Sequence, residues 1–219
     1  MEFTKVVRSR RMVRNYDPDR SVSRETIEQL LELAIRAPSA GFSQGWHFLV
    51  LDAEADRDRF WQLTTDAGIP DSWLRGMQTA PVLVLALSDR DAYLDRYAQP
   101  DKGWTDRDEA RWPVPYWDID TGMASLLVLL GAVDRGLASC FFGVPPAHQA
   151  AVKQGFGIPD RLRIVGVISL GYGAPDQKSK SLRRGRRGLD QVLSYGRMAE
   201  PAATERAATA PAGSAPAGS

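Results

Sequence analysis

The run TGMASLLVLLGAVDRG, residues 121–136, constrains the fold more than any other part of this sequence. Its apolar residues occupy nearly every face of a helix, and Gly136 stands where a glycine often ends one. A helix of this kind has to be buried on all sides, so other elements must surround it. Its hydrophobic surface is larger than one small domain readily covers, which predicts that part of the helix contacts a partner subunit.

Four short apolar runs are predicted to form the sheet that packs on this helix. HFLVLD (47–52) and PVLVLALS (81–88) are rich in leucine or β-branched residues and lie between breakers, as buried strands do. ASCFFG and LRIVGVISLGYG supply two more strands. A helical pattern with Ser23 as a plausible cap precedes the first run, and others lie between the runs, one of them introduced by Pro145. The order predicts an α+β fold with helices around a mixed sheet.

Composition narrows the class of protein. The 219 residues are enough for one globular domain with a sizeable core. A formal net charge of +1 gives no global field that would recruit nucleic acid or an anionic membrane. Cys140 is the one cysteine, and the chain has two histidines, so we expect neither a disulfide framework nor a metal site. The first residues lack the apolar core of a signal peptide, which predicts a cytoplasmic protein.

The domain is expected to span residues 1–198. Residues 199–219 consist mainly of Ala, Pro, Gly and Ser, with almost nothing to bury, and are predicted to form a disordered tail. Within the domain, residues of about 89–117 form an insertion with a high density of aromatic side chains among many charges. Such rings often form a satellite cluster that packs one or two helices onto the body of a domain.

Three segments could carry chemistry, although each has an ordinary explanation. RSRRMVRNY, near the start, could be a solvated basic helix end. KSKSLRRGRRGLDQVL could be a basic surface loop, or a weak nucleic-acid patch without aromatics to stack bases. APSAGFSQGWHF, residues 37–48, could be a tight connection in which Trp46 fills the core. None of the three identifies a function when taken alone.

In their order and spacing, however, these segments resemble the nitroreductase family of FMN-dependent oxidoreductases. The resemblance rests on RRMVRNY, APSAGFSQGWHF, GLASCFFG after the long apolar helix, and RRGRRGLDQVL, and it covers roughly residues 3–198. It implies a nitroreductase-like mixed sheet flanked by helices, in an intertwined homodimer. In such a dimer the segment PSAGFSQ would cross the two-fold interface and touch the flavin of the partner.

The resemblance also implies which residues bind FMN. Arg10, Arg184 and Arg186 would hold the phosphate, because guanidinium groups bind phosphate bidentately. Arg14 would lie at the N1 and O2 edge of the ring, where a cation favours the anionic reduced flavin and raises its reduction potential. The other implied contacts are Arg11, Met12, Pro38, Ser39, Ala40, Phe42, Phe142 and Gly143.

The sequence departs from the family pattern at several of these positions. Phe42 stands where the family usually has an asparagine that contacts the flavin, and its side chain cannot form a hydrogen bond. Met12 replaces a common serine, and Gly45 replaces the proline of the usual QPW. The polar or acidic residue usually found beside the flavin N5 is missing from the segment that ends in Phe142 and Gly143. An apolar pocket wall is therefore expected there.

The implied function is that of an NAD(P)H-dependent reductase of nitroaromatic, quinone or related conjugated acceptors. Hydride would pass through flavin N5 in ping-pong turnover, with no catalytic side chain. The alternatives are a specialised flavoenzyme of the same fold, such as a dehydrogenase, dehalogenase or flavin-cleaving enzyme, and a flavin-binding protein with little turnover. Trp104, Trp112 and Tyr116 in the insertion would form either a substrate lid or the satellite cluster. A basic-tail nucleic-acid binder is disfavoured by the net charge.

Overall fold

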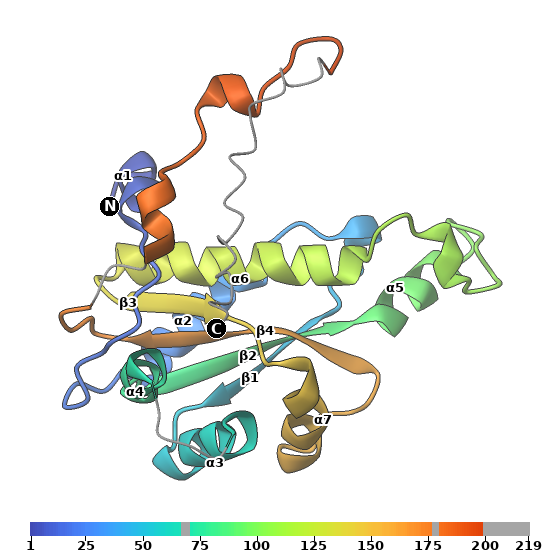
Figure 1. Cartoon of the computed structure of the whole chain (residues 1–219). Helices are drawn as coiled ribbons and strands as arrows, with labels where there is room; N and C mark the ends of the chain where they lie inside the picture. Colours follow the sequence, from blue (N-terminus) through green and yellow to red (C-terminus); the bar gives the residue numbers. More distant parts are fainter. Residues whose placement is uncertain (67–70, 177–179, 199–219) are drawn as a thin grey trace, which may run out of the picture. The chain divides into compact units, whose positions relative to one another are not determined.

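The computed structural model describes residues 1–66, 71–176 and 180–198. The chain divides into two compact units, Met1–Asp176 and Gln177–Ser219, and each is described by itself. The first unit, called the body below, contains every strand and α-helix of the described chain (Figure 1). The predicted tail, residues 199–219, lies outside the described residues.

Four antiparallel strands form the sheet of the body, in the order β1-β2-β4-β3. Their bounds are Trp46–Leu51 for β1, Val82–Asp89 for β2, Ala138–Phe142 for β3 and Leu162–Gly171 for β4. These are the four predicted runs, and the α+β class is confirmed. We expected a mixed sheet, but every pairing among the described strands is antiparallel. The central strand β2 is buried along its whole length, which explains why its sequence does not alternate.

Seven α-helices surround this sheet in the described part of the chain. They are α1 (Phe3–Ser9), α2 (Arg24–Ala34), α3 (Glu54–Thr64), α4 (Ser72–Gln78), α5 (Arg90–Tyr97), α6 (Tyr116–Asp134) and α7 (Pro146–Gly155). Two short 3-10 turns of the body are η1 (Ala40–Phe42) and η2 (Glu109–Arg111). Ser23 caps α2 as predicted, since its side chain accepts a hydrogen bond from the Thr26 N–H.

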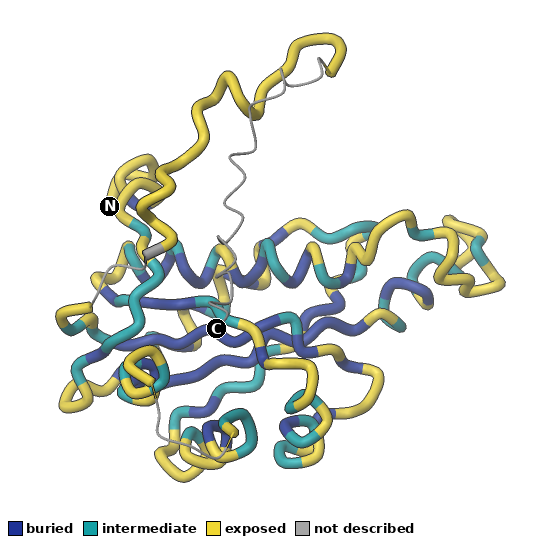
Figure 2. The backbone as a smooth tube through the Cα atoms, in the orientation of Figure 1, coloured by how far each residue is buried: buried dark blue, intermediate teal, exposed yellow. Residues whose placement is uncertain are grey.

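Two hydrophobic cores lie on the two faces of the sheet (Figure 2). The first core joins the sheet to α2 and α6, and includes Leu30 and Val128, both completely buried. The second core joins the opposite face to α3, α4 and α7, and includes Phe60 and Val152. The sheet is therefore covered on both sides, with α6 running across one of them.

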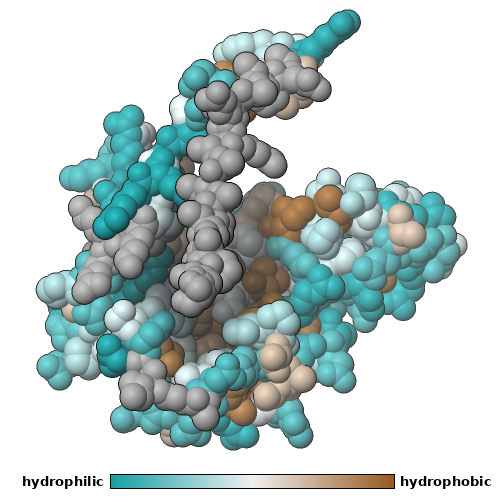
Figure 3. All heavy atoms as spheres, in the orientation of Figure 1, coloured by the Kyte–Doolittle hydropathy of each residue, from teal (hydrophilic) through white to brown (hydrophobic). Residues whose placement is uncertain are grey.

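The α6 helix is not buried all round within one chain. Ile119 is 42% exposed and Leu126 is 46% exposed, and a Cβ added at Gly122 would meet no described residue within 4 Å. These positions follow at spacings that place them on one face of a helix, and Figure 3 shows hydrophobic surface over part of α6. We call this face the α6 stripe. By length and composition, α6 is also the one helix of the described chain that could span a membrane, but half of its apolar window is buried in the body, as in a core helix.

Candidate functional site

The first arginine segment runs from the end of α1 along the edge of β3. The Val13 N–H donates a hydrogen bond to the Ser139 carbonyl on that strand, at 3.0 Å. The Tyr16 hydroxyl donates to the Val13 carbonyl at 2.8 Å and lies 2.7 Å from Ser169 Oγ on β4. Two strands of the sheet therefore fix the backbone that carries the predicted arginines.

The guanidinium of Arg10 contains a buried donor that has no partner in the described part of the chain. Its Nη1 atom is inaccessible to solvent and has no hydrogen-bond acceptor among the described residues. Leaving such a group unsatisfied is costly, and a buried unpaired donor at a surface segment commonly marks a place for a ligand. An anion with several oxygen acceptors, such as a phosphate, fits this donor.

The three other predicted flavin contacts of this segment have different partners. Arg11 Nη1 donates to the carbonyls of Arg8 and Arg10, at 2.9 and 3.1 Å, and so closes the end of α1. Arg14 Nη1 donates to the Met12 carbonyl at 3.0 Å, which holds the Arg14 side chain beside its own backbone. The Met12 side chain lies inside the body against both cores, where its sulfur accepts a hydrogen bond from a β3 backbone N–H.

The loop between α2 and β1 carries four more predicted contacts: Pro38, Ser39, Ala40 and Phe42. Its backbone is strained, since Gly41, Phe42 and Gln44 have φ of +61°, +56° and +52°. Residues other than glycine rarely adopt this conformation. The Phe42 ring is 75% exposed, whereas Ala40 is partly buried. We call residues 39–44 the strained loop; it presents an aromatic ring outward.

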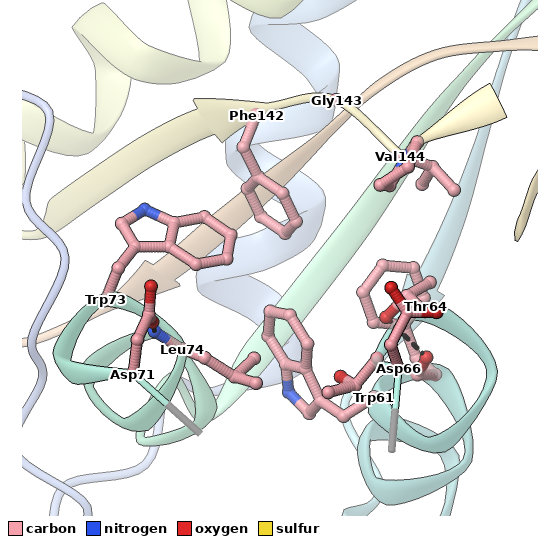
Figure 4. A pocket seen from close by; sticks show the side chains of 12 residues that line it. Trp61, Thr64, Asp66, Asp71, Trp73, Leu74, Phe142, Gly143 and Val144 are labelled. Carbon is pink, nitrogen blue, oxygen red and sulfur yellow. Dashed lines mark hydrogen bonds between the residues drawn. The ribbon is translucent and has the colours of Figure 1, made fainter. Parts of the chain in front are cut away.

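Phe142 and Gly143 line a cavity of about 370 Å³ between α3, α4 and the end of β3 (Figure 4). The Phe142 ring stacks on Trp61 with centroids 5.8 Å apart, and it meets Trp73 edge-on at 5.9 Å. The Trp61 indole N–H is buried and has no partner in the described chain. The cavity therefore offers aromatic walls, and its wall is apolar at Phe142, where the sequence predicted one.

The aromatic rings of the insertion pack on one another. Trp112 lies at the centre, with ring centroids between 4.6 and 6.0 Å from those of five neighbours: Tyr93, Tyr97, Trp104, Tyr116 and Trp117. We call these six residues the aromatic cluster. None of them lines the cavity of Figure 4. The body therefore shows a satellite cluster of the kind expected, and the substrate lid stays a prediction.

Arg184 and Arg186 belong to the second unit. Arg184 ends the short turn η3 (Lys180–Arg184), and Gly185 follows it with φ of +68°. Both arginine side chains are exposed, and neither has a hydrogen bond or ion pair within the described residues. Their donors are thus not committed to partners of the described chain.

Sequence reasoning missed three contributors to these arrangements. Trp61 lies in a segment whose pattern predicts only a helix, and Trp73 lies in a segment without a predicted element; a helical pattern does not reveal which ring faces a cavity. Asp120 lies in the first turns of α6, where it is 2% exposed and accepts a hydrogen bond from the Ala40 N–H of the strained loop. No local pattern indicated this role, because Asp118 stands two residues before it and the donors to Asp120 come from other elements.

Known proteins resemble this chain along most of its length. Residues 7–172 match the model of the Nitroreductase family. A protein of Archaeoglobus fulgidus, provisionally named NADH dehydrogenase/NAD(P)H nitroreductase, is 32% identical over 173 residues, which cover 78% of this chain and 85% of the relative. The 4-nitrobenzoate reductase of a Nocardioides species is 30% identical over 223 residues, covering 88% of this chain and 89% of the enzyme.

Solved structures share the fold. A protein of Exiguobacterium sibiricum, provisionally named a nitroreductase and crystallised in complex with FMN, superposes with a TM-score of 0.68. The superposition covers 89% of this chain and 97% of the other, at 23% sequence identity. At that identity the likeness concerns the fold alone.

Proposed function

The chain belongs to the nitroreductase family, and from this premise we propose that it is an FMN-dependent enzyme that uses NAD(P)H to reduce nitroaromatic, quinone or related conjugated acceptors. Family membership and the names of the relatives make it an oxidoreductase that acts on small molecules. The observation that carries the finer proposal is the buried, unpaired Nη1 of Arg10, in the segment where the resemblance places the FMN phosphate. The FMN bound to a protein of the same fold supports it.

When bound, FMN would supply a ring atom, N5, that accepts hydride from the donor and passes it to the acceptor. The side chains of the protein would bind and orient the cofactor. In this proposal Arg10, Arg184 and Arg186 would bind the phosphate, and the charge of Arg14 would favour the anionic reduced flavin. The further candidate contacts are Arg11, Met12, Pro38, Ser39, Ala40, Phe42, Phe142 and Gly143.

The cavity of Figure 4 is our candidate for the acceptor site. Its volume of about 370 Å³ lies in the range of small-molecule sites, roughly 300–1,000 Å³. Planar conjugated molecules stack on aromatic walls such as those of Phe142 and Trp73. These features favour flat, conjugated acceptors.

The proposed function is tested by spectra and turnover of the purified full-length chain. We expect flavin absorbance that bleaches without oxygen when NADH or NADPH is added, and returns when 4-nitrobenzoate or benzoquinone follows. Heat-released flavin should be FMN. A chain that binds FMN but is bleached by neither nucleotide would favour a flavin-binding protein, and a chain with no affinity for FMN would end the proposal.

Loss of Arg10 is expected to weaken FMN binding without weakening the apoprotein. In Arg10→Ala, a phosphate ligand worth roughly 1.5–3 kcal/mol disappears, which is about ten- to hundredfold in Kd. The melting temperature without FMN should not fall, because Nη1 has no partner among the described residues. FMN titration and thermal melts measure both effects. The exposed Arg8→Ala serves as control, and equal FMN affinity in the two variants would contradict the assignment.

We also propose that the enzyme is a homodimer in which the α6 stripe contacts the partner subunit. Leu126 is 46% exposed in the middle of this apolar face. Leu126→Glu would bury a charge at such an interface, so light scattering is expected to show a shift from two chain masses to one. Ala150→Glu, at an exposed position of α7, is the control that should remain dimeric. A wild-type monomer that retains FMN would refute the shared site. Cytoplasmic location stays a prediction.

A further inference from the structure

A buried carboxylate on α6 binds the backbone of the strained loop. Asp120 is 2% exposed, and its Oδ2 atom accepts a hydrogen bond from the Ala40 N–H at 2.8 Å. The same oxygen accepts a second bond from the Tyr93 hydroxyl, also at 2.8 Å, and Tyr93 is completely buried on α5. One carboxylate of α6 therefore joins the loop to α5, which lies within the insertion.

A second set of contacts reaches the loop from α5. Arg96 Nε donates to the Gly41 carbonyl at 2.9 Å, while its two terminal nitrogens pair with Asp101 at 2.7 Å. A Cβ at Gly41 would come within 2.5 Å of the Tyr97 ring, so the loop backbone lies directly against the aromatic cluster. Position 41 requires glycine both for this close approach and for its positive φ.

These contacts explain how the loop keeps an unfavourable conformation. Left-handed backbone at a residue such as Phe42 persists only where surrounding contacts impose it. The Phe42 ring gains little within this chain, because it is 75% exposed. The contacts thus act on the backbone, and the Phe42 side chain that they present is exposed.

We propose that Asp120 is a positioning residue that holds the strained loop in the shape needed at the flavin site of the partner subunit. In this arrangement the aromatic cluster influences the site through its contact with the loop backbone. This inference rests on the proposed function, in which the loop completes a site shared between two copies. Burial, and next the bond to Asp120, raise the pKa of Tyr93, so Tyr93 keeps the proton that it donates.

The direct test is amide hydrogen exchange of peptides that cover residues 38–46 in the full-length chain. In Asp120→Ala the Ala40 amide loses its acceptor, and we expect exchange about tenfold faster or more. Asp120→Asn keeps an acceptor oxygen and should restore most of the protection. Asp118→Ala is the control, because Asp118 lies on the same helix but pairs with Ser88 and Arg163.

The second readout concerns the site. With FMN bound, Asp120→Ala is expected to raise the acceptor KM severalfold and to change the visible circular dichroism of the flavin, and Asp120→Asn should reverse both changes. Should Asp120→Ala fail to fold, Arg96→Ala removes the other contact that holds the loop, at a partly exposed position. It should change the exchange rate, the acceptor KM and the flavin dichroism in the same direction.

Each outcome of these experiments supports or contradicts one part of the proposal. Faster exchange together with changed KM and flavin dichroism supports the proposal. Unchanged exchange in both Asp120→Ala and Arg96→Ala overturns the positioning role. Faster exchange with unchanged KM and dichroism overturns the place of the loop in the site. A wild-type chain that binds no FMN refutes the proposed function instead, while the exchange comparison still decides whether Asp120 holds the loop.

Discussion

The Arg184→Ala, Arg186→Ala double variant is expected to lose FMN on dialysis. Each guanidinium is proposed to make charge-assisted hydrogen bonds to the phosphate, and losing each should weaken binding by about tenfold or more. Because neither side chain has a partner within the described residues, the stability of the apoprotein should not change. Quenching of flavin fluorescence during titration measures the affinity, and urea unfolding measures the stability.

A matched double variant separates phosphate binding from general electrostatics. Arg183→Ala, Arg187→Ala removes the same number of charges from the same segment. If both double variants lose the same affinity, the segment acts only as a diffuse positive field, and a loss reversed by high salt would agree with that. If the Arg184 and Arg186 double variant keeps FMN through dialysis, these two residues are not phosphate ligands.

Trp112→Ala is expected to lower the free energy of unfolding by about 3 kcal/mol. This value is the low end of the range for a buried tryptophan, because Trp112 is only partly buried. The variant removes the ring around which the other five members of the aromatic cluster pack. Trp112→Phe keeps an aromatic ring, and the indole N–H that it removes has no partner among the described residues. Its free energy of unfolding should therefore fall by less than that of Trp112→Ala. Urea unfolding of the FMN-free chain gives both values.

Alanine variants of the aromatic cluster decide whether its rings form a satellite cluster or a substrate lid. For a cluster, the ratio of kcat/KM for a nitroaromatic to that for a quinone should stay constant in Trp112→Ala, Trp104→Ala and Tyr116→Ala. A lid that stacks on the acceptor would shift this ratio, because the two acceptors differ in the area they offer to an aromatic ring. A shifted ratio with wild-type stability would restore the lid hypothesis.

Local pattern predicted the elements of this fold well. The four strands were recognisable because buried strands need continuous apolar runs, and Ser23 because a helix start needs a side-chain acceptor. The pairing of the strands was not recognisable in the same way, since an apolar run is compatible with parallel and antiparallel neighbours. The mixed sheet expected from the order of the elements was therefore wrong, because the described strands pair only in antiparallel fashion.

The candidate site was harder to predict from residues alone. Phe42 was identified by its position in a motif, yet its left-handed backbone depends on partners more than fifty residues away, as the bond from Arg96 to Gly41 illustrates. Asp120 gave no local signal of its role, because its donors come from two other elements. Residue type indicates which chemistry is available, whereas long-range contacts decide which side chain is buried, strained or left without a partner.

Strand β2 lies between β1 and β4, and β4 is far from it in sequence. This arrangement sets the order in which the sheet can form while the chain is being synthesised. Val82–Asp89 pairs with Leu162–Gly171, so one edge of the central strand has no partner until the ribosome has released nearly the whole body. Pairings between such distant segments form slowly, and unpaired apolar strands of a nascent chain are prone to aggregate. The apolar α6 emerges within the same interval. Chains that stop before β4 should therefore depend on chaperones, and the body becomes able to fold only once its last strand has been made.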